Sequence, residues 1–198
     1  MRVDDVQVPA SPAAVAAREV AAEYCSPALF NHSERSYYFA VGFASVLALD
    51  FDAELLYVSA LLHDLGLTSA FDNHRMAFET AGGHAAWVLT AGAGWPTARR
   101  RRALEVIERH MWPSVDPAFD PEGHLLEIAT GLDISGSRPD VLPRNFLNEV
   151  LARHPRLGLG AEFTACLTDQ AERKPDTPAA RLVAGGLAEK LRGHPLEG

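Results

Sequence analysis

The segment Ser59–Thr68, SALLHDLGLT, places a histidine and an aspartate side by side, as His63 and Asp64, at the end of the apolar run Leu55–Leu62. Burying two ionisable side chains is costly unless they are paired, hydrogen-bonded or bound to a cation. Imidazole and carboxylate together form a ligand set that suits Zn, Fe, Mn or Ni. A histidine and an aspartate that only hydrogen-bond each other at the end of a helix would have the same sequence. Other parts of the chain are therefore needed to distinguish such a pair from a metal site.

The composition is that of a soluble globular protein of one domain, with 198 residues, 47% of them apolar and 22% charged. The net charge of −8 argues against nucleic acid or an anionic membrane surface as a partner. We interpret the basic cluster Arg99–Arg102 as the solvated face of a helix, with an anion site as the alternative. Cys25 and Cys166 have no CxxC partner, which is typical of reduced thiols. No apolar run approaches about 18 residues and the N-terminus lacks a signal pattern, so we expect a cytoplasmic protein that does not enter a membrane.

Nearly every segment carries a helical pattern, and none shows sustained alternation of period two or an Asn-Gly or Asp-Gly hairpin signal. The segment 111–123 contains three prolines and is predicted to be an ordered loop. The expected helices are 12–24, a second that Asn31 or Ser33 caps, a third that Asp50–Asp52 caps and that delivers His63 and Asp64, then 74–90, one from Pro96 to His110, and 123–134, 140–153, 159–173 and 178–192. The sequence therefore predicts an all-α fold.

Four potential metal ligands occur along the chain, in the order His32, His63, Asp64 and Asp133, each in a mainly apolar helical context. Metal sites in helical bundles are built from side chains that project inward from different helices. Two neutral imidazoles supply lone pairs, and two carboxylates offset the charge of a divalent cation, which leaves positions open for water. A metal in that setting lowers the pKa of bound water and makes hydroxide available near neutral pH.

This H…HD…D pattern resembles the HD-domain superfamily of metal-dependent hydrolases. The resemblance implies an all-α helical bundle with a buried metal site, held by His32, His63, Asp64 and Asp133. Longer strings are similar to the cyanamide hydratase-like branch. They are NHSERSYY (31–38), SALLHDLGLT (59–68), FETAGG (78–83), LDISG (132–136) and HPRLGLGAEF (154–163). From this resemblance we expect the chain to have three parts. These are an N-terminal helical extension, 1–26, packed on the core, an HD domain, 27–175, and a C-terminal helix and tail of the same domain, 176–198.

The number of metal ions depends on the residues between the HD pair and the final aspartate. HD proteins with two metals have extra histidines there, and Glu79 stands where one of them would be expected, while His110 is a candidate for the other. His84 lies about one turn beyond Glu79 but matches no family ligand. We therefore expect one divalent ion, zinc before iron, manganese or nickel. A carboxylate can also hold a second iron, so a dinuclear iron oxygenase stays open.

Other residues near these motifs have two interpretations each. Arg35 would orient a polarised substrate, or it is a surface arginine paired with Glu34 or Asp50. Glu79 would be a general base or proton shuttle, or a buried carboxylate that bonds helix-end amides.

Three further residues are assigned to substrate binding, namely Asn31, Thr68 and His110. Asn31 would otherwise be an N-cap and Thr68 a turn residue. Arg156 and Lys174 match the branch's C-terminal segment and have no role that the sequence explains.

The function that the resemblance implies is a metal-dependent hydratase or hydrolase that adds water to a small carbon–nitrogen compound, as in the conversion of cyanamide to urea. Asp64 or Glu79 would move the proton. One alternative is a phosphohydrolase of nucleotides or phosphomonoesters, in which Arg35 or Arg75 would contact phosphate. Others are the dinuclear oxygenase and a ligand-binding protein with a structural metal. The expected partner is a small-molecule substrate, and the aromatic residues outside the expected core are compatible with a homodimer.

Overall fold

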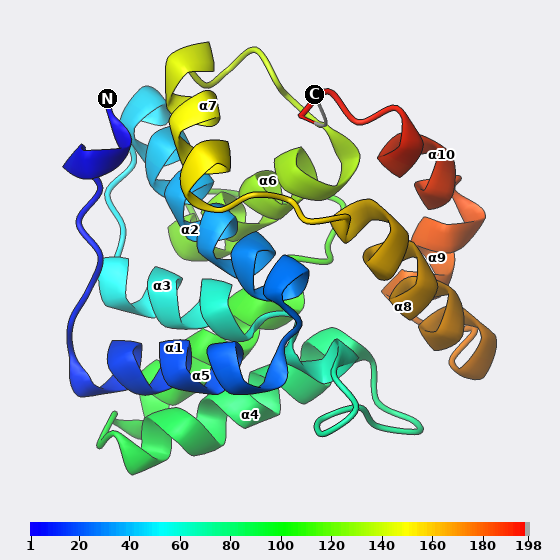
Figure 1. Ribbon diagram of the computed structural model, residues 1–198. Coiled ribbons are helices and arrows are strands. Elements are labelled where there is room, and N and C mark those ends of the chain that lie inside the picture. Colours follow the sequence, from blue (N-terminus) through cyan, green and yellow to red (C-terminus); the bar gives the residue numbers. More distant parts are fainter. Residues whose placement is uncertain (197–198) are drawn as a thin grey trace.

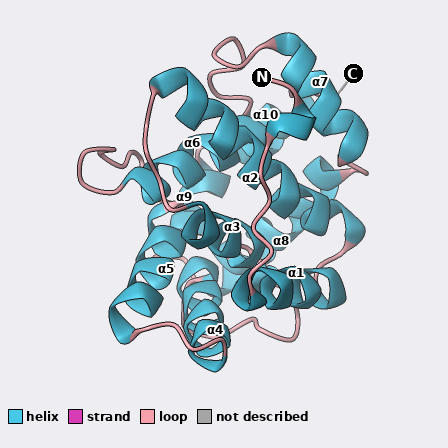
Figure 2. Ribbon diagram, turned by 90° about the vertical axis from the view of Figure 1, so that its left-hand side faces the viewer, coloured by secondary structure: helices cyan, strands magenta, loops and turns pink. Residues whose placement is uncertain are grey.

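The computed structural model describes residues 1–196, which form ten α-helices, two short 3-10 helices and no strand (Figures 1 and 2). This confirms the all-α prediction. None of the helices in this range is long and apolar enough to cross a membrane. The elements in chain order are η1 (Val3–Asp5), α1 (Pro12–Tyr24), α2 (Pro27–Leu47), α3 (Ala53–Leu62), η2 (Leu65–Leu67), α4 (Phe78–Gly92), α5 (Thr97–Arg109), α6 (Pro121–Ser135), α7 (Arg144–Arg153), α8 (Leu159–Arg173), α9 (Pro178–Ala184) and α10 (Leu187–Arg192).

Helix α2 is the central element, because it packs on α3, α6, α7 and α8. Ser26 caps it by accepting a hydrogen bond from the Leu29 amide, and Pro27 occupies the first position, where a missing N–H costs nothing. Most of its residues are buried, including the ionisable His32, Glu34 and Arg35. Buried charges of this kind require partners, so α2 is expected to contribute side chains to a functional site.

Helix α3 runs beneath α2 and ends at the His-Asp pair. Asp52 caps it by accepting from the Leu55 amide, and every residue of Leu55–Leu62 is buried. A helix that is apolar on all sides belongs to the centre of a protein. Its C-terminus therefore delivers His63 and Asp64 into the core rather than to the surface.

Two glycines allow α4 to approach the turn that follows α3. A Cβ on Gly82 would lie 2.8 Å from the Leu62 carbonyl oxygen and 2.9 Å from that of His63. A Cβ on Gly66 would lie 2.1 Å from the Phe78 carbonyl oxygen. All three distances are too short for any side chain, so the two glycines allow the His-Asp turn to pack tightly against α4.

The remaining helices surround this centre. In Figure 1, α4 and α5 lie side by side below α3, with α1 across the same side, and α7 lies beside α2 at the top. The C-terminal helices α8, α9 and α10 gather at one side of the molecule, where α10 also contacts α6. One side of α6 therefore faces α2, while another faces the C-terminal helices.

The predicted start of the second helix was wrong. It begins at Pro27 with Ser26 as its cap, so neither Asn31 nor Ser33 caps it. The Ser-Pro pair is a stronger start signal, because proline at the first position follows a serine whose side chain accepts an amide hydrogen bond.

Three later helices also differ from the prediction. Helix α4 begins at Phe78, because the Asn73 side chain takes the amides of Arg75 and Met76 in a turn that a helix cannot share. Helix α7 begins at Arg144, just after Pro143. The predicted helix 178–192 is divided into α9 and α10, since Gly186 adopts a left-handed conformation with φ of +81°.

Candidate metal centre

Three potential metal ligands meet where α2 and α3 come together. The Nε2 atoms of His32 and His63 are 3.1 Å apart, and Asp64 Oδ2 lies 3.4 Å from the first and 3.2 Å from the second. All three side chains are at most 1% exposed. The sequence prediction that these residues form a buried group of metal-binding type is confirmed.

Hydrogen bonds on the far side of each imidazole leave Nε2 without a proton when the ring is neutral. His63 Nδ1 donates to the Ala60 carbonyl oxygen at 2.8 Å, and His32 Nδ1 donates to Asp133 Oδ2 at 2.6 Å. Because a carbonyl or carboxylate oxygen only accepts, Nδ1 carries the proton in both rings. Two nitrogen lone pairs and a carboxylate oxygen therefore converge on one point, which is the arrangement that a cation stabilises.

The Asp64 carboxylate is the strongest sign of a missing positive charge. Neither of its oxygen atoms accepts a hydrogen bond from the residues that the structure describes, although both are buried. Burial by itself raises the pKa of this group, but the His63 and His32 imidazoles outweigh that effect and hold its pKa below the usual range. A charged carboxylate without hydrogen bonds in the core is costly, and a divalent ion between it and the two imidazoles would remove that cost.

The pKa of His32 is raised above its usual value, although burial by itself lowers it. The hydrogen bond to Asp133 and the nearby Asp64 carboxylate outweigh the effect of burial. Two carboxylates therefore favour positive charge beside His32, which a bound divalent ion would supply.

The structure places Asp133 behind His32 and outside this group of three. Its Oδ2 binds His32 Nδ1, and both oxygens accept from the Arg35 guanidinium at 2.7–3.0 Å. Arg156 Nη1 donates to Oδ1 at 2.8 Å and to the Asp133 carbonyl oxygen at 2.6 Å. A carboxylate that binds the far nitrogen of a histidine ligand fixes the orientation and tautomer of the ring. In this arrangement both Asp133 oxygens already have partners.

Arg35 is completely buried, so it is not the surface arginine that the sequence left open. Glu34 pairs instead with Arg18, at 2.9 Å. Besides Asp133, Arg35 donates through Nη1 to the carbonyl oxygens of His154 and Pro155. It therefore joins α2, α6 and the segment before α8 around the carboxylate.

His110 lies at the C-terminal end of α5 and faces the group from the other side. Its Nδ1 hydrogen-bonds the Ile107 carbonyl oxygen, its Nε2 lies 4.0 Å from Asp64 Oδ1, and its ring centre is 4.7 Å from that of His63. Burial, and next the charge of His63, lower the pKa of His110 to about 3. This imidazole is therefore neutral, with a lone pair on Nε2 directed toward the cluster.

A cavity of about 190 Å³ opens beside these four residues. Its walls include a stripe on one face of α6, formed by Glu127, Thr130, Gly131 and Ile134, at helical spacing. Sequence reasoning missed this stripe. A signal was present, because these residues repeat at helical spacing on α6, the same helix that carries the candidate site residue Asp133.

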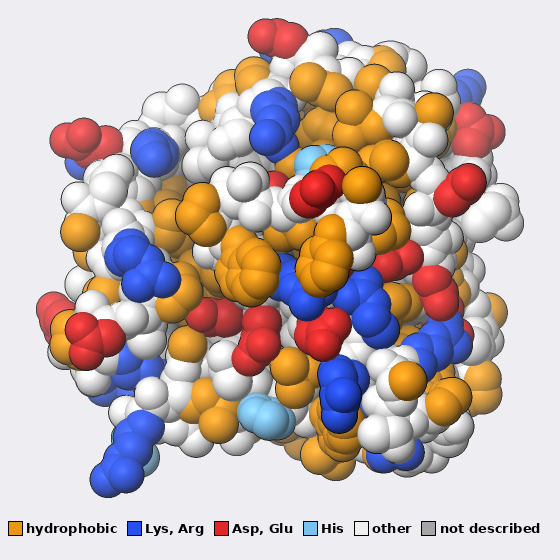
Figure 3. Space-filling model, turned by 180° about the vertical axis from the view of Figure 1, so that it is seen from behind, with side chains coloured by type: hydrophobic (Ala, Val, Ile, Leu, Met, Phe, Trp, Pro, Cys, Tyr) orange, Lys and Arg blue, Asp and Glu red, His pale blue; other side chains and the backbone are white. Residues whose placement is uncertain are grey.

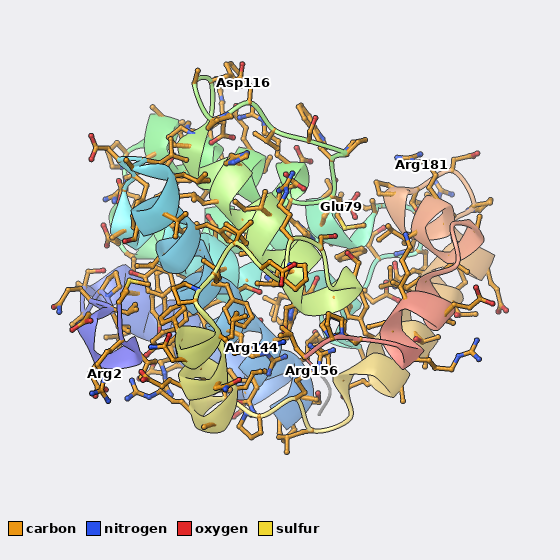
Figure 4. All side chains as sticks on the ribbon, turned by 90° about the horizontal axis from the view of Figure 1, so that it is seen from above. Arg2, Glu79, Asp116, Arg144, Arg156 and Arg181 are labelled. Atoms are coloured by element: carbon orange, nitrogen blue, oxygen red, sulfur yellow. The ribbon has the colours of Figure 1, made fainter. Side chains whose placement is uncertain are left out.

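The other residues assigned to substrate or catalysis do not line this cavity. Asn31 Nδ2 donates to the Pro155 carbonyl oxygen, and Thr68 Oγ1 donates to the Leu65 carbonyl oxygen within a turn. Glu79 lies in the first turn of α4, where burial raises the pKa of its carboxyl to about 6, with smaller contributions from Glu108 and Asp64. Figure 4 shows Glu79 well apart from Arg156, so these two side chains do not belong to one cluster.

Comparison with known proteins agrees with this geometry. The family model described as HD domain matches residues 29–134, more than half of the chain. The chain belongs to the HD-domain family and, within it, to a cyanamide hydratase-like branch. It is similar to two proteins of Saccharomyces cerevisiae, cyanamide hydratase DDI2 and cyanamide hydratase DDI3. Each is 31% identical over 174 residues, which cover 86% of this chain and 77% of the yeast protein. The protein is thus a metal-dependent hydrolase or hydratase of the HD family.

Proposed function

We propose that this protein is a hydratase that adds water to the carbon–nitrogen triple bond of a small molecule of the cyanamide class, at one divalent ion. The buried Asp64 carboxylate faces two imidazoles and accepts no hydrogen bond from residues 1–196, and this is the observation that carries the proposal. The yeast relatives named cyanamide hydratases support the choice of substrate.

His32, His63 and Asp64 would hold the ion, and His110 is the fourth side chain that faces it. The set of imidazole and carboxylate donors favours zinc and is also compatible with iron, manganese or nickel. When bound, a divalent ion supplies a Lewis acid and lowers the pKa of water. Asp133 would act as a positioning residue, because it holds the Nδ1 proton of His32.

The chain's own groups would carry the proton. In the overall reaction the oxygen of water bonds to the nitrile carbon, and both hydrogens end on the nitrile nitrogen, so that cyanamide becomes urea. Asp64 lines the cavity, with Oδ2 facing the imidazoles and Oδ1 4.0 Å from His110 Nε2. Of the two carboxylates expected to move the proton, Glu79 does not line the cavity, so Asp64 would take a proton from water and return it to nitrogen.

The test is the metal content and the urea produced from cyanamide, measured on the same preparation. We expect about one ion per chain and urea formation that is lost in His63→Ala and in Asp64→Ala, together with the metal. His84→Ala is the matched control, because His84 is an exposed histidine on α4. Full metal content in both site variants, or no urea from metal-replete protein, would contradict the proposal.

Neither arginine expected to contact phosphate is placed to do so, although Lys190 lines the cavity. The Arg35 guanidinium is already bound by Asp133 and two carbonyl oxygens. Arg75 is exposed and does not line the cavity. A panel of phosphomonoesters assayed beside cyanamide separates the two functions directly.

A further inference from the structure

The cavity above the metal-type cluster has three levels. At its base lie the four residues His32, His63, Asp64 and His110, all 7% exposed or less. Three apolar side chains with 3–7% exposure form the middle, namely Ile134, Phe163 and Leu187. Trp112, 50% exposed, and Leu182, 38% exposed, stand at the mouth. The route from solvent to the cluster is therefore mainly apolar.

This cavity is larger than cyanamide requires. A water molecule takes about 30 Å³ in the liquid, and cyanamide has only one carbon and two nitrogens, whereas the cavity measures about 190 Å³. Cyanamide is also polar at both ends and has no apolar group that could contact Ile134, Phe163 and Leu187. Apolar walls around unused space are typical of a site that binds a substrate with an apolar portion.

Glu127 is an acidic residue of these walls, whose other polar side chains are Thr130, Ser135, Ser137 and Lys190. It lies on the α6 stripe, three residues before Thr130 and seven before Ile134. Its Oε2 is buried and accepts no hydrogen bond from the residues that the structure describes. Burial raises the pKa of its carboxyl, and the charge of Arg138 opposes this by less. Because Glu127 also lines the cavity, its carboxylate is placed to accept a hydrogen bond from a donor on the molecule that fills it.

We propose that the cavity binds an N-substituted cyanamide, R–NH–C≡N, with the nitrile at the metal-type cluster, the N–H hydrogen-bonded to Glu127, and the apolar group R against Ile134, Phe163 and Leu187. This rests on the hydratase function proposed above and names its substrate class. The carbon–oxygen bond forms at the nitrile carbon, both hydrogens of water end on the nitrile nitrogen, and the product is the N-substituted urea. No oxidant or reductant takes part.

Two comparisons test the substrate. The first measures kcat/KM for cyanamide and for N-methyl-, N-propyl- and N-butylcyanamide with metal-replete protein. Each added methylene buried on the walls contributes about 0.8 kcal/mol at most, which corresponds to a roughly fourfold rise in kcat/KM per group. The second compares N-propylcyanamide with N-methyl-N-propylcyanamide, which lacks the N–H. Wild-type protein is expected to prefer the former.

Glu127→Met tests the role of Glu127, because methionine keeps the length of the side chain and has no oxygen acceptor. Loss of a hydrogen bond to a charged group lowers kcat/KM on N-propylcyanamide by about tenfold to a hundredfold. The dialkyl compound has no N–H to lose and its kcat/KM stays within about twofold of wild type, whereas a merely structural defect would lower both. Glu172→Met, an exposed position on α8, is the matched control.

Leu182→Glu tests the apolar wall at its mouth, where the side chain is partly exposed and the fold tolerates a charge. It lowers kcat/KM on N-butylcyanamide more than on cyanamide. Leu47→Glu, at a leucine of similar exposure at the end of α2, is the control.

Three results overturn the inference. If kcat/KM falls with the length of R while cyanamide itself is hydrated, the substrate class is wrong and the hydratase function stands. If Glu127→Met lowers kcat/KM equally for N-propylcyanamide and for N-methyl-N-propylcyanamide, Glu127 does not bind the N–H. If no cyanamide of any kind is hydrated by metal-replete protein, the proposed function fails, and this inference fails with it.

Discussion

Replacing Asp133 by asparagine removes the buried negative charge on which Arg35 and Arg156 converge. Asp133 and Arg35 are both 0% exposed, and their closest contact is 2.7 Å. Asparagine fills the same volume and keeps one acceptor oxygen, so the effect is that of charge rather than of packing. Removing one partner of a buried ion pair costs about 3–5 kcal/mol, and we expect the free energy of unfolding to fall by that amount.

The assay is urea denaturation of the metal-free protein, followed by circular dichroism, with titration of zinc as a second measurement. Asp169→Asn is the matched control, because Asp169 pairs with Arg173 on the surface, where its side chain is 60% exposed. An exposed pair contributes less than about 1 kcal/mol. Zinc affinity should fall by about tenfold to a hundredfold in Asp133→Asn, as for a residue that orients a ligand.

Two results would refute the reasoning. A loss of stability no larger than that of Asp169→Asn would mean that the charge of Asp133 does not hold the arginines. Complete loss of zinc binding with unchanged stability would instead make Asp133 a direct ligand, as the family resemblance implies, rather than the support of His32.

The other predictions concern the surroundings of the site. Gly66→Ala places a Cβ against the Phe78 carbonyl oxygen and should lower stability by about 1–3 kcal/mol, measured by thermal unfolding. Glu79 has its pKa raised from 4.5 to about 6, so its contribution to stability is present below pH 4.5 and is lost as pH rises through 6. Glu79→Gln should therefore exceed wild type by about 2 kcal/mol at pH 7 and match it below pH 4.5, and equal stability at both pH values would contradict this. Lys174→Met removes the hydrogen bonds of the ammonium group to Asp72 and the Met76 carbonyl oxygen, and should accelerate amide exchange in residues 69–77.

The sequence predicted the parts of the site that depend on local pattern. His63 and Asp64 could be placed in the core because the run that precedes them is apolar on all sides. His32 could be joined to them because its helix carries the matching string. The first of these predictions uses only the spacing of apolar residues and the cost of burying a charge, whereas the second depends on the resemblance to the HD-domain superfamily.

The parts that sequence reasoning could not supply depend on contacts between distant segments. A carboxylate such as Asp133 can either bind a metal or orient a histidine, and the difference depends on partners such as Arg35 and Arg156, which approach it from other elements. The cavity likewise depends on a contact between distant segments, because Glu127 and Leu187 line it together only when α10 packs beside α6. Figure 3 shows charged and apolar side chains mixed over one face, and no sequence window describes such a surface.

The C-terminal part of the cavity wall and the metal-type base are encoded in separate stretches of the chain. The base comes from residues before 111, whereas Phe163, Leu182 and Leu187 come from the last three helices, beyond the match to the family model. The connection at Leu157 and Gly158 lies after Arg156, so a gene fusion at that point keeps Asp133 and its arginines intact. Exchange of the segment from 159 onward between relatives would therefore alter the apolar part of the wall while the α6 stripe and the metal-type base stay the same, so the range of substrates would change without a change in the metal-type cluster.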